Sequence, residues 1–340
     1  MRALTLRAGR GAAIEDVPEP PLSSRDLLVE SVVVGVCGTD RWLLGRRPSL
    51  PPGQDYLVMG HESLGRVVSA PAGSEFAAGE LVVGTVRRPD PVPCASCRRG
   101  EVDFCENGRY TERGITGRDG FASERYALEA DYAIRVDPGL GLSAVLVEPV
   151  SIVVKAWAQL DRVVRRPIRR ALILGAGPIG LLATLVAAQR GYAVEVVDRV
   201  GSGPKVDQVA ALGAEYHRSP GGLTADFDVV LECTGSLTSA AIRLARPGGA
   251  TCLIGGGHGD PPDPGTIEDL AGHLLTHNKI VVGTVNSNPS HFLQALTVLA
   301  SADPGWLHAM IGPRVDVEQW RSAIHPDGRS IKAVIRFADV

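Results

Sequence analysis

The sequence predicts an α/β protein, with a doubly wound parallel sheet joined to a second, mostly-β domain. After Pro167, short apolar strands alternate with helices over short connections. A glycine pattern, GAGPIG, stands between the first of these strands and its helix. Before residue 150, short apolar runs are punctuated by Gly and Pro, which is typical of β structure. A length of 340 residues also favours two domains.

In the α/β part, ALIL reads as a buried strand because it is short and wholly apolar. The expected elements, in order, are strand 171–174, helix 181–191, strand 193–198, helix 205–213, strand 227–235, a helix ending in ARPGG at 249, strand 250–256 and an edge strand at 280–285.

The mostly-β part is expected to use the runs 26–36, 65–70 and 80–86 as strands. The segment IKAVIRF (331–337) also has a strand pattern, and we expect it to return to this domain. The predicted domains are therefore 1–147 with 289–340, and 148–288.

Charge and composition exclude several classes of partner. A net charge of −3 without a basic run argues against nucleic acids and anionic membranes. The uncharged run 171–188 contains glycines and a proline that would break a membrane-spanning helix. The N-terminus has no apolar signal core, so we expect a cytoplasmic protein. Lysine is rare and occurs only at 155, 205, 279 and 332.

The glycine pattern indicates a dinucleotide-binding Rossmann domain. Gly175 permits the tight turn, Gly177 lets a pyrophosphate approach the backbone, and Gly180 lets the helix lie close to the sheet. Asp198 ends the next strand, where a carboxylate accepts ribose hydroxyls and repels a 2′-phosphate. We therefore expect NAD rather than NADP, although the neighbouring Arg199 could hold a phosphate.

Zinc-type ligands occur in the rest of the chain. Cys37, His61 and Glu148 are a thiol, an imidazole and a carboxylate, the groups that catalytic zinc uses with one position left open. They are far apart in sequence, and Cys37 alone could be a buried core residue. Spacing by itself leaves both readings open.

The motifs CGTD, GHESLG, EPVS and GAGPIG together resemble the medium-chain zinc-dependent alcohol and polyol dehydrogenases, in the same order along the chain. The segments TVRRP, YTERGI, HNK and GTVN resemble the microbial glucose dehydrogenase branch of that family. The resemblance implies a GroES-like catalytic domain beside the Rossmann domain, and a homodimer or homotetramer joined at the edge strand.

The resemblance also implies the site residues. The catalytic zinc ligands would be Cys37, His61 and Glu148, with Glu62 binding in some steps. Thr39 matches the hydroxyl that passes the substrate proton outward, and Asp40 matches the carboxylate that orients the ligating histidine. The substrate contacts would be Thr39, Glu112, Glu148 and Asn286. The dinucleotide contacts would be Gly175, Gly177, Pro178, Ile179, Gly180, Asp198, Arg199, Thr234, Gly255, Gly256, Val285 and Asn286.

A second cysteine group, PCASCRRGEVDFC, resembles the structural zinc lobe of the family. It supplies Cys94, Cys97 and Cys105, whereas the family's first cysteine falls at Pro91. Structural zinc takes four closed ligands. Asp90 or water would therefore have to complete the site, or the lobe holds no metal.

These features predict a zinc-dependent, NAD(P)-linked dehydrogenase acting on a hydroxyl of a sugar-like substrate. The branch usually carries an acidic residue before the lysine that is Lys155 here, and this chain has Val154. That loss of a polar contact favours an amino sugar or the sugar ring of an aminoglycoside-type natural product. Plain glucose 1-dehydrogenase, a zinc-free quinone or enone reductase, and a non-catalytic dinucleotide-binding regulator are the alternatives.

Overall fold

The computed structural model describes residues 1–256, 267–325 and 330–338. The chain forms two compact units, the first made of Met1–Ser151 and Asn286–Val340 and the second of Ile152–Val285. The expected boundaries at 147/148 and 288/289 lie a few residues away. Helix α3 (Val147–Val163) runs across the first boundary.

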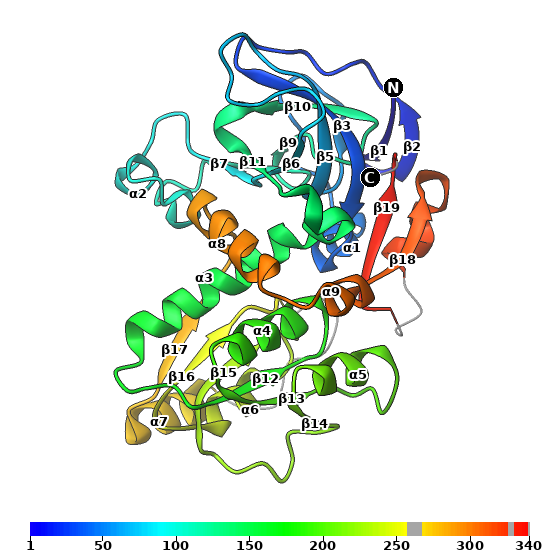
Figure 1. Ribbon diagram of the computed structural model, residues 1–340. Helices are drawn as coiled ribbons and strands as arrows, with labels where there is room; N and C mark the ends of the chain where they lie inside the picture. The colour runs from blue at the N-terminus through cyan, green and yellow to red at the C-terminus, as the bar shows by residue number, and fades with distance from the viewer. Residues whose placement is uncertain (257–266, 326–329, 339–340) are drawn as a thin grey trace. The chain divides into compact units, whose positions relative to one another are not determined.

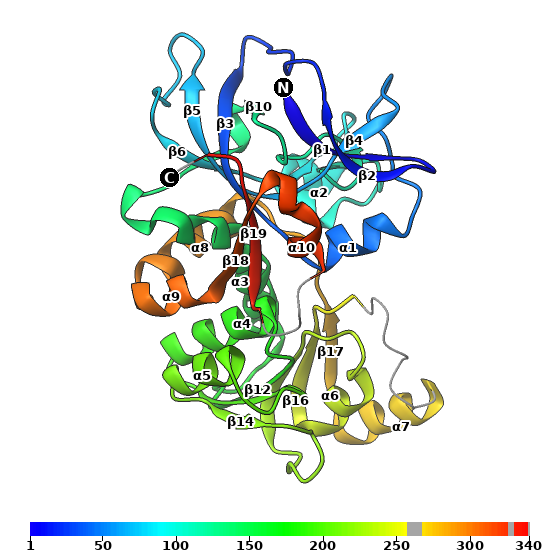
Figure 2. The same ribbon diagram turned by 90° about the vertical axis from the view of Figure 1, so that its right-hand side faces the viewer.

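The second unit is a six-stranded parallel sheet in the order β14-β13-β12-β15-β16-β17, which confirms the predicted α/β class (Figures 1 and 2). Chain order reverses between β12 and β15, the point at which ligands bind outside the strand ends in such sheets. Its elements are β12 (Arg170–Leu174), α4 (Pro178–Gln189), β13 (Ala193–Val197), α5 (Pro204–Ala211), β14 (Glu215–His217), β15 (Phe227–Glu232), α6 (Thr238–Leu244), β16 (Ala245–Leu253), α7 (Ile267–His277) and β17 (Ile280–Gly283).

Burial explains why the central strands read as continuous apolar runs. All of β15 is buried, as are four residues of β12, because helices cover a parallel sheet on both faces. The predicted end of the helix, at 249 in ARPGG, is wrong. Helix α6 stops at Leu244, and Ala245 already pairs with Phe227 across an irregular stretch of β16.

The first unit contains a seven-stranded sheet in the order β11-β6-β5-β3-β19-β18, with β10 also pairing β3. Two three-stranded sheets, β2-β1-β4 and β7-β8-β9, complete it. The strands are β1 (Arg2–Arg7), β2 (Gly11–Asp16), β3 (Asp26–Gly35), β4 (Tyr56–Val58), β5 (Glu62–Ser69), β6 (Leu81–Gly84), β7 (Arg87–Arg88), β8 (Thr111–Arg113), β9 (Gly117–Arg118), β10 (Arg125–Glu129), β11 (Ala133–Arg135), β18 (Ile311–Asp316) and β19 (Lys332–Arg336).

Short helices connect these strands. They are α1 (Gly38–Leu44), α2 (Ala95–Arg98), η1 (Val102–Phe104), η2 (Ala130–Tyr132), η3 (Pro138–Leu146), α8 (Pro289–Ala300), α9 (Pro304–Met310), η4 (Val317–Gln319) and α10 (Trp320–Ile324). The core includes Phe121 and Tyr126, whose rings meet edge to face with centroids 4.9 Å apart. Strand β19 pairs antiparallel with β3, so the C-terminal segment completes this sheet.

A charged cluster ties the small β7-β8-β9 sheet to β10. The Glu129 carboxylate accepts hydrogen bonds from Arg88 at 2.8 Å, Arg113 at 3.0 Å and Arg118 at 2.6 Å. Burial alone would raise the pKa of Glu129, but the three guanidinium groups outweigh it and hold that pKa far below its usual range. One carboxylate therefore gathers an arginine from each strand of the small sheet.

One helical stretch, Pro138–Val163, is long and apolar enough to cross a membrane by composition. However, 72% of its most apolar window is buried inside the protein, and Gly141 interrupts the helix with φ 49°. Such burial is typical of a core helix in a folded domain.

Candidate active site

Cys37 and His61 meet in the first unit. Cys37 is the residue before helix α1, and its sulfur accepts a hydrogen bond from the backbone N–H of Thr39 at 3.2 Å. The sulfur lies 3.0 Å from Nε2 of His61, which precedes strand β5. Residues from two separate loops thus bring a thiol and an imidazole into contact.

Asp40 orients this pair. One carboxylate oxygen accepts the backbone N–H of Cys37 at 2.8 Å, and the other lies 3.5 Å from Nδ1 of His61. Burial opposes charge on His61, but Cys37 and Asp40 outweigh it and raise the pKa of the imidazole well above its usual value. With Asp40 at Nδ1, the ring presents Nε2 to the sulfur, the arrangement found around metal-binding histidines.

Glu62 follows His61 and completes the group. The ligand atoms of Cys37, His61 and Glu62 all lie within 4.8 Å of one another. Glu62 forms a buried ion pair with Lys332 of β19, whose Nζ also donates to the carbonyl of Val36 at 3.1 Å. Gly35 lies opposite Glu62, and a side chain there would overlap its carboxylate.

Glu148, in the first turn of α3, is buried. Burial raises its pKa to about 7, helped by repulsion from the Glu62 carboxylate and opposed by His61 and Lys332. Glu148 is outside the 4.8 Å group, yet it lies close enough for these charges to act on it.

The donors fit a zinc ion. A thiol, an imidazole nitrogen and a carboxylate lie together, with Asp40 beside His61 and Lys332 paired with Glu62. Glu148 supplies a further buried carboxylate. We propose Cys37, His61 and Glu148 as its ligands, with Glu62 as the fourth candidate.

The Glu112 carboxylate is fixed by Arg87 and Asn286. It accepts hydrogen bonds from Arg87 at 2.9 and 3.1 Å and from the Asn286 amide at 2.6 Å. The Arg87 guanidinium stacks over Tyr110 at 3.7 Å. Asn286, which we expected within 148–288, begins the second segment of the first unit, and this hydrogen bond joins it to β8.

The phosphate loop of the second unit has the expected geometry. Gly175 has φ 103°, and a side chain on Gly180 would overlap the carbonyl of Gly175. Gly177 precedes helix α4 without any side-chain cap, and a Cβ there would meet no atom within 4 Å. The first turn of α4, with Pro178 and Ile179, therefore has space at its N-terminus for a pyrophosphate, so the loop fits a dinucleotide.

Asp198 lies at the end of β13. Its carboxylate accepts the backbone N–H of Ala176 at 2.8 Å and of Val200 at 3.2 Å, and Lys205 Nζ lies 3.6 Å away. Arg199 is exposed beside it. The carboxylate that we expect to select the ribose is therefore hydrogen-bonded to the phosphate loop and has the cations Lys205 and Arg199 near it.

Three of the remaining predicted dinucleotide residues follow strands β15 and β16, and Val285 is the last residue of the second unit. Thr234 and Gly255 are in contact at the ends of these strands, and Gly256 is exposed next to them. Val285 is 67% exposed, and its carbonyl accepts a hydrogen bond from buried Lys155 at 2.8 Å.

Sequence reasoning assigned no role to Arg87, Lys155 or Lys332. Because the chain has only four lysines, each of them could have been examined as a residue with a specific polar partner. All four lysines hold a defined polar group: Lys155 the Val285 carbonyl, Lys205 the Asp198 carboxylate, Lys279 the carbonyls of Ile242 and Arg243, and Lys332 the Glu62 carboxylate.

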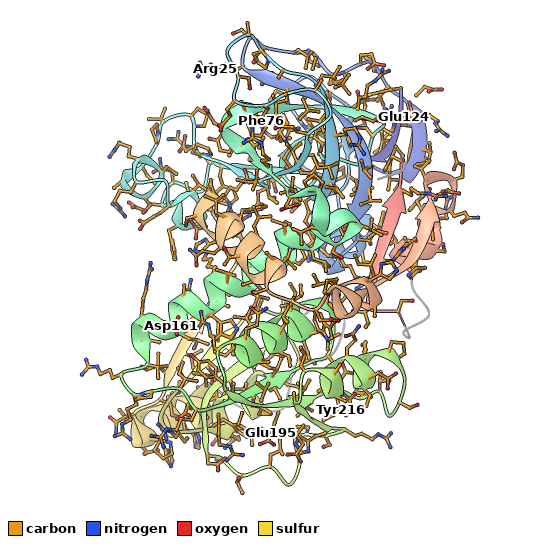
Figure 3. The ribbon with its side chains drawn as sticks, viewed as in Figure 1. Arg25, Phe76, Glu124, Asp161, Glu195 and Tyr216 are labelled. Atoms are coloured by element: carbon orange, nitrogen blue, oxygen red, sulfur yellow. The ribbon has the colours of Figure 1, made fainter. Side chains whose placement is uncertain are left out.

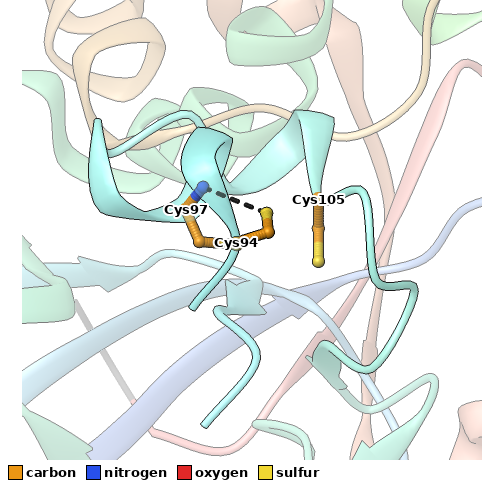
Figure 4. Close-up of side chains that lie close together, drawn as sticks. All are labelled: Cys94, Cys97 and Cys105. Atoms are coloured by element: carbon orange, nitrogen blue, oxygen red, sulfur yellow. Dashed lines mark hydrogen bonds between the residues drawn. The ribbon is translucent and has the colours of Figure 1, made fainter. Parts of the chain in front are cut away.

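Three cysteines gather in the lobe around α2 (Figure 4). The sulfurs of Cys94, Cys97 and Cys105 lie within 4.8 Å, and Cys94 accepts backbone N–H groups from Cys97 and Glu106, each at 3.4 Å. These two hydrogen bonds lower the pKa of Cys94 to about 7. The sulfurs fit three of the four positions of a structural zinc site.

Asp90 does not join this group in the described structure. Its carboxylate accepts hydrogen bonds from the Val92 N–H at 2.8 Å, Asn107 at 2.8 Å and Arg109 at 3.0 Å. Three thiolates would therefore be the protein ligands of a lobe zinc, with water in the fourth position, or the lobe holds no metal.

A three-thiolate zinc should be lost more easily than the catalytic zinc. Titration with a chelator should remove zinc in two steps, and Cys97→Ser should eliminate only the first of them. Zinc analysis by mass spectrometry reads both steps. A single equivalent of zinc that Cys97→Ser leaves in place would show that the lobe holds none.

A third group of possible ligands, Glu195, Glu215 and His217, lies on β13 and β14 of the second unit (Figure 3 labels Glu195). His217 contacts Glu195 at 2.8 Å, and Arg170 also pairs with Glu195 at 2.7 Å. The carboxylate is thus already neutralised by side chains, and we assign it no function.

Known proteins resemble both parts of the chain. Residues 23–138 match the alcohol dehydrogenase GroES-like domain, and residues 142–337 match the family described as glucose dehydrogenase C-terminus. Glucose 1-dehydrogenases of Methanocella arvoryzae and Thermoproteus tenax are each 36% identical, over 99% of this chain and 99% of theirs. The crystal structure of Haloferax mediterranei glucose dehydrogenase in complex with NADP, Zn and gluconolactone is 28% identical with a TM-score of 0.90, and each chain is covered completely.

The fold and the site define a zinc-dependent dehydrogenase that uses a nicotinamide dinucleotide. Within that class, the chain belongs to the glucose dehydrogenase family of medium-chain dehydrogenases. The resemblance found in the sequence motifs is confirmed.

Proposed function

We propose that the protein oxidises the anomeric hydroxyl of glucose to the lactone. The observation that carries this proposal is the buried Cys37–His61–Glu62 group, in a chain whose full-length relatives are glucose 1-dehydrogenases. A zinc-free reductase would have no use for that group. A dinucleotide-binding regulator would need neither the zinc ligands nor the fixed Glu112 carboxylate.

The chain's own residues supply binding and proton transfer. Glu112, held by Arg87 and Asn286, would accept hydrogen bonds from ring hydroxyls of the sugar. Thr39, in the first turn of α1 beside the Cys37 sulfur, would take the proton of the reacting hydroxyl and pass it outward. Asp40 would keep His61 oriented throughout.

Two bound groups would complete the chemistry. Cys37, His61 and Glu148 would hold a zinc ion, which would supply Lewis-acid chemistry at the substrate hydroxyl. The loop at Gly175, Gly177 and Gly180 would hold the dinucleotide, which would supply the acceptor for the hydride of the sugar carbon. The reaction thus releases one proton and yields lactone and reduced dinucleotide.

The expected amino-sugar substrate has no support from the comparisons, which favour the glucose alternative. Val154 is buried in α3 and offers no polar group. Its hydrophobic side chain removes a contact but adds no group that would recognise an amine. Glucose is therefore the better-supported substrate.

Steady-state kinetics on glucose, galactose, glucosamine and an aminoglycoside test this proposal. We expect glucose to give a specificity constant of about 10⁴ M⁻¹s⁻¹ or higher. Turnover of the amino compounds with none of glucose would contradict it. Absence of dinucleotide reduction with every sugar, in zinc-loaded protein, would point to the non-catalytic alternative.

Cofactor preference can be tested at Asp198. We still expect NAD to be preferred, although the comparisons do not confirm this and the NADP in the H. mediterranei complex favours the opposite result. Asp198→Asn removes the charge that repels a 2′-phosphate. The NADP/NAD ratio of specificity constants should rise about tenfold, since a single charge contact contributes about 1–3 kcal/mol.

Lys205→Ala is the matched control for this experiment. It removes a cation 3.6 Å from the same carboxylate, so the ratio should fall instead of rise. An unchanged ratio in both variants would show that neither residue selects the dinucleotide. A clear NADP preference in the unmutated enzyme would overturn the expectation of NAD.

We also propose that the protein is a homodimer or homotetramer joined at β17. This strand ends the six-stranded sheet and is only partly buried, and exposed apolar edges invite pairing. Leu275 before it is 80% exposed. Sedimentation should show a dimer or larger, and a monomer at micromolar concentration would count against this assembly.

A further inference from the structure

Strand β15 ends in a buried carboxylate that serves the next turn. Glu232 is 1% exposed. Its two oxygens accept the backbone N–H of Thr234 at 2.8 Å and of Gly235 at 2.8 and 3.0 Å. The Thr234 hydroxyl donates to the same carboxylate. The charge is thus satisfied by consecutive residues of one turn.

This turn is confined between two glycines. A Cβ on Gly175 of the phosphate loop would lie 2.8 Å from the Thr234 methyl carbon. A Cβ on Gly255 would lie 2.7 Å from the carbonyl carbon of Thr234. The backbone carbonyl of Glu232 also accepts the N–H of Gly255 at 3.0 Å. Glu232 therefore sets the position of the turn relative to both neighbouring loops.

The contacts of Glu232 bear on function because of where the Thr234–Gly235 turn lies. Strand β15 pairs with β12 on one side and β16 on the other (Figure 1), so the turn that follows β15 lies at the carboxyl edge of the sheet, next to the switch in chain order. Dinucleotides bind at that edge in sheets of this kind. A small movement of Thr234 or Gly235 would alter the wall against which the cofactor lies.

We propose that Glu232 is a positioning residue for the dinucleotide, acting through the Thr234–Gly235 turn. This inference rests on the proposed function. A carboxylate is suited to this task because its oxygens only accept hydrogen bonds. The Thr234 and Gly235 groups that contact Glu232 are all donors. A glutamine would place an amide NH₂ against backbone N–H groups and leave a buried donor without an acceptor.

The test is Glu232→Gln, with direct NADH binding measured by fluorescence titration. We expect the dissociation constant and the KM for the dinucleotide to rise about tenfold, because a mispaired buried polar group carries a penalty of that order. The kcat at saturating dinucleotide should stay within about threefold of the parent, since the turn touches no reacting atom. Glu232→Asp, which keeps the charge, should restore part of the affinity.

Asp228 is the matched control on the same strand. It is also buried, and it accepts the backbone N–H groups of Arg169 at 2.7 Å and Arg170 at 2.9 Å, at the opposite end of β15. Asp228→Asn should lower the melting temperature of the protein as Glu232→Gln does, but leave NADH affinity unchanged.

Equal loss of affinity in the Glu232 and Asp228 variants would overturn the inference, as would parental affinity in Glu232→Gln. If Glu232→Gln does not fold, Glu232→Asp decides: parental affinity would overturn the inference, and a several-fold loss beside an unaffected Asp228→Asn would support it. An unmutated protein that binds NADH but oxidises no sugar would refute the proposed function alone.

Discussion

Cys37→Ser should reduce glucose turnover by about a thousandfold or more, since Lewis-acid stabilisation of the reacting oxygen contributes several kcal/mol and each 1.36 kcal/mol is a factor of ten. The serine hydroxyl is a poor zinc ligand, and the sulfur it replaces lies 3.0 Å from Nε2 of His61. NADH affinity should change little, because the phosphate loop and Asp198 belong to the other unit. Steady-state assays of glucose turnover and fluorescence titration with NADH, made on the same preparation, measure the two effects.

His61→Ala should likewise reduce glucose turnover strongly and leave NADH affinity nearly unchanged. Cys252→Ala is the control, because Cys252 is a buried cysteine of β16 outside all three candidate ligand groups of the described residues. It should keep its zinc and most of its activity. Substantial turnover by zinc-depleted Cys37→Ser would refute the zinc mechanism.

Lys332→Ala should destabilise the first unit by about 3–5 kcal/mol, the usual result of removing one partner from a buried ion pair. Lys332 is 1% exposed and Glu62 is 2% exposed, so a lone Glu62 carboxylate would remain without water. The midpoint of urea unfolding, monitored by the tryptophans of this unit, gives the change. Adding Glu62→Gln to Lys332→Ala should recover part of the loss, because it removes the stranded charge.

Arg336→Ala, four residues further along β19, is the matched control. Arg336 pairs with Asp316 at 2.7 Å, but both side chains are about half exposed, at 51% and 54%. Such pairs contribute less than about 1 kcal/mol. Equal destabilisation by the two variants would show that strand integrity, and not the buried charge pair, accounts for the Lys332 result.

The parts of the fold that follow from local pattern were predictable. The strand-helix alternation after Pro167 placed β12, α4 and β13 to within a few residues, and the motif context identified the phosphate loop. The end of α6 was not predictable from local pattern. Whether Ala245 continues a helix or begins a strand depends on its pairing with Phe227, a contact that no local pattern encodes.

Site residues could be singled out from the sequence where the side-chain type itself indicates the chemistry. They were missed where the role depends on a contact with a residue far away in the chain. Cys37 and His61 have side chains of the type that zinc binds, and the resemblance singled them out and supplied Asp40. Lys332 lies in a strand-like apolar segment, and only the pairing of β19 with β3 brings it to Glu62. The hydrogen bond from Asn286 to Glu112 joins residues 174 positions apart, and no local pattern encodes such a contact.

The adjacent arginines of β7 have a consequence for how this enzyme can evolve. Successive side chains of a strand point to opposite faces, so Arg87 holds Glu112 while Arg88 holds Glu129. The alignment of this two-residue strand is thus specified by charge pairing instead of by apolar side chains. Sliding the strand by one position would bring only one of the two guanidinium groups to a carboxylate and leave the other carboxylate without its arginine. An insertion or deletion within β7 would break that phase, and a substitution at 112 would leave the buried Arg87 guanidinium without its carboxylate while the Glu129 anchor stays intact.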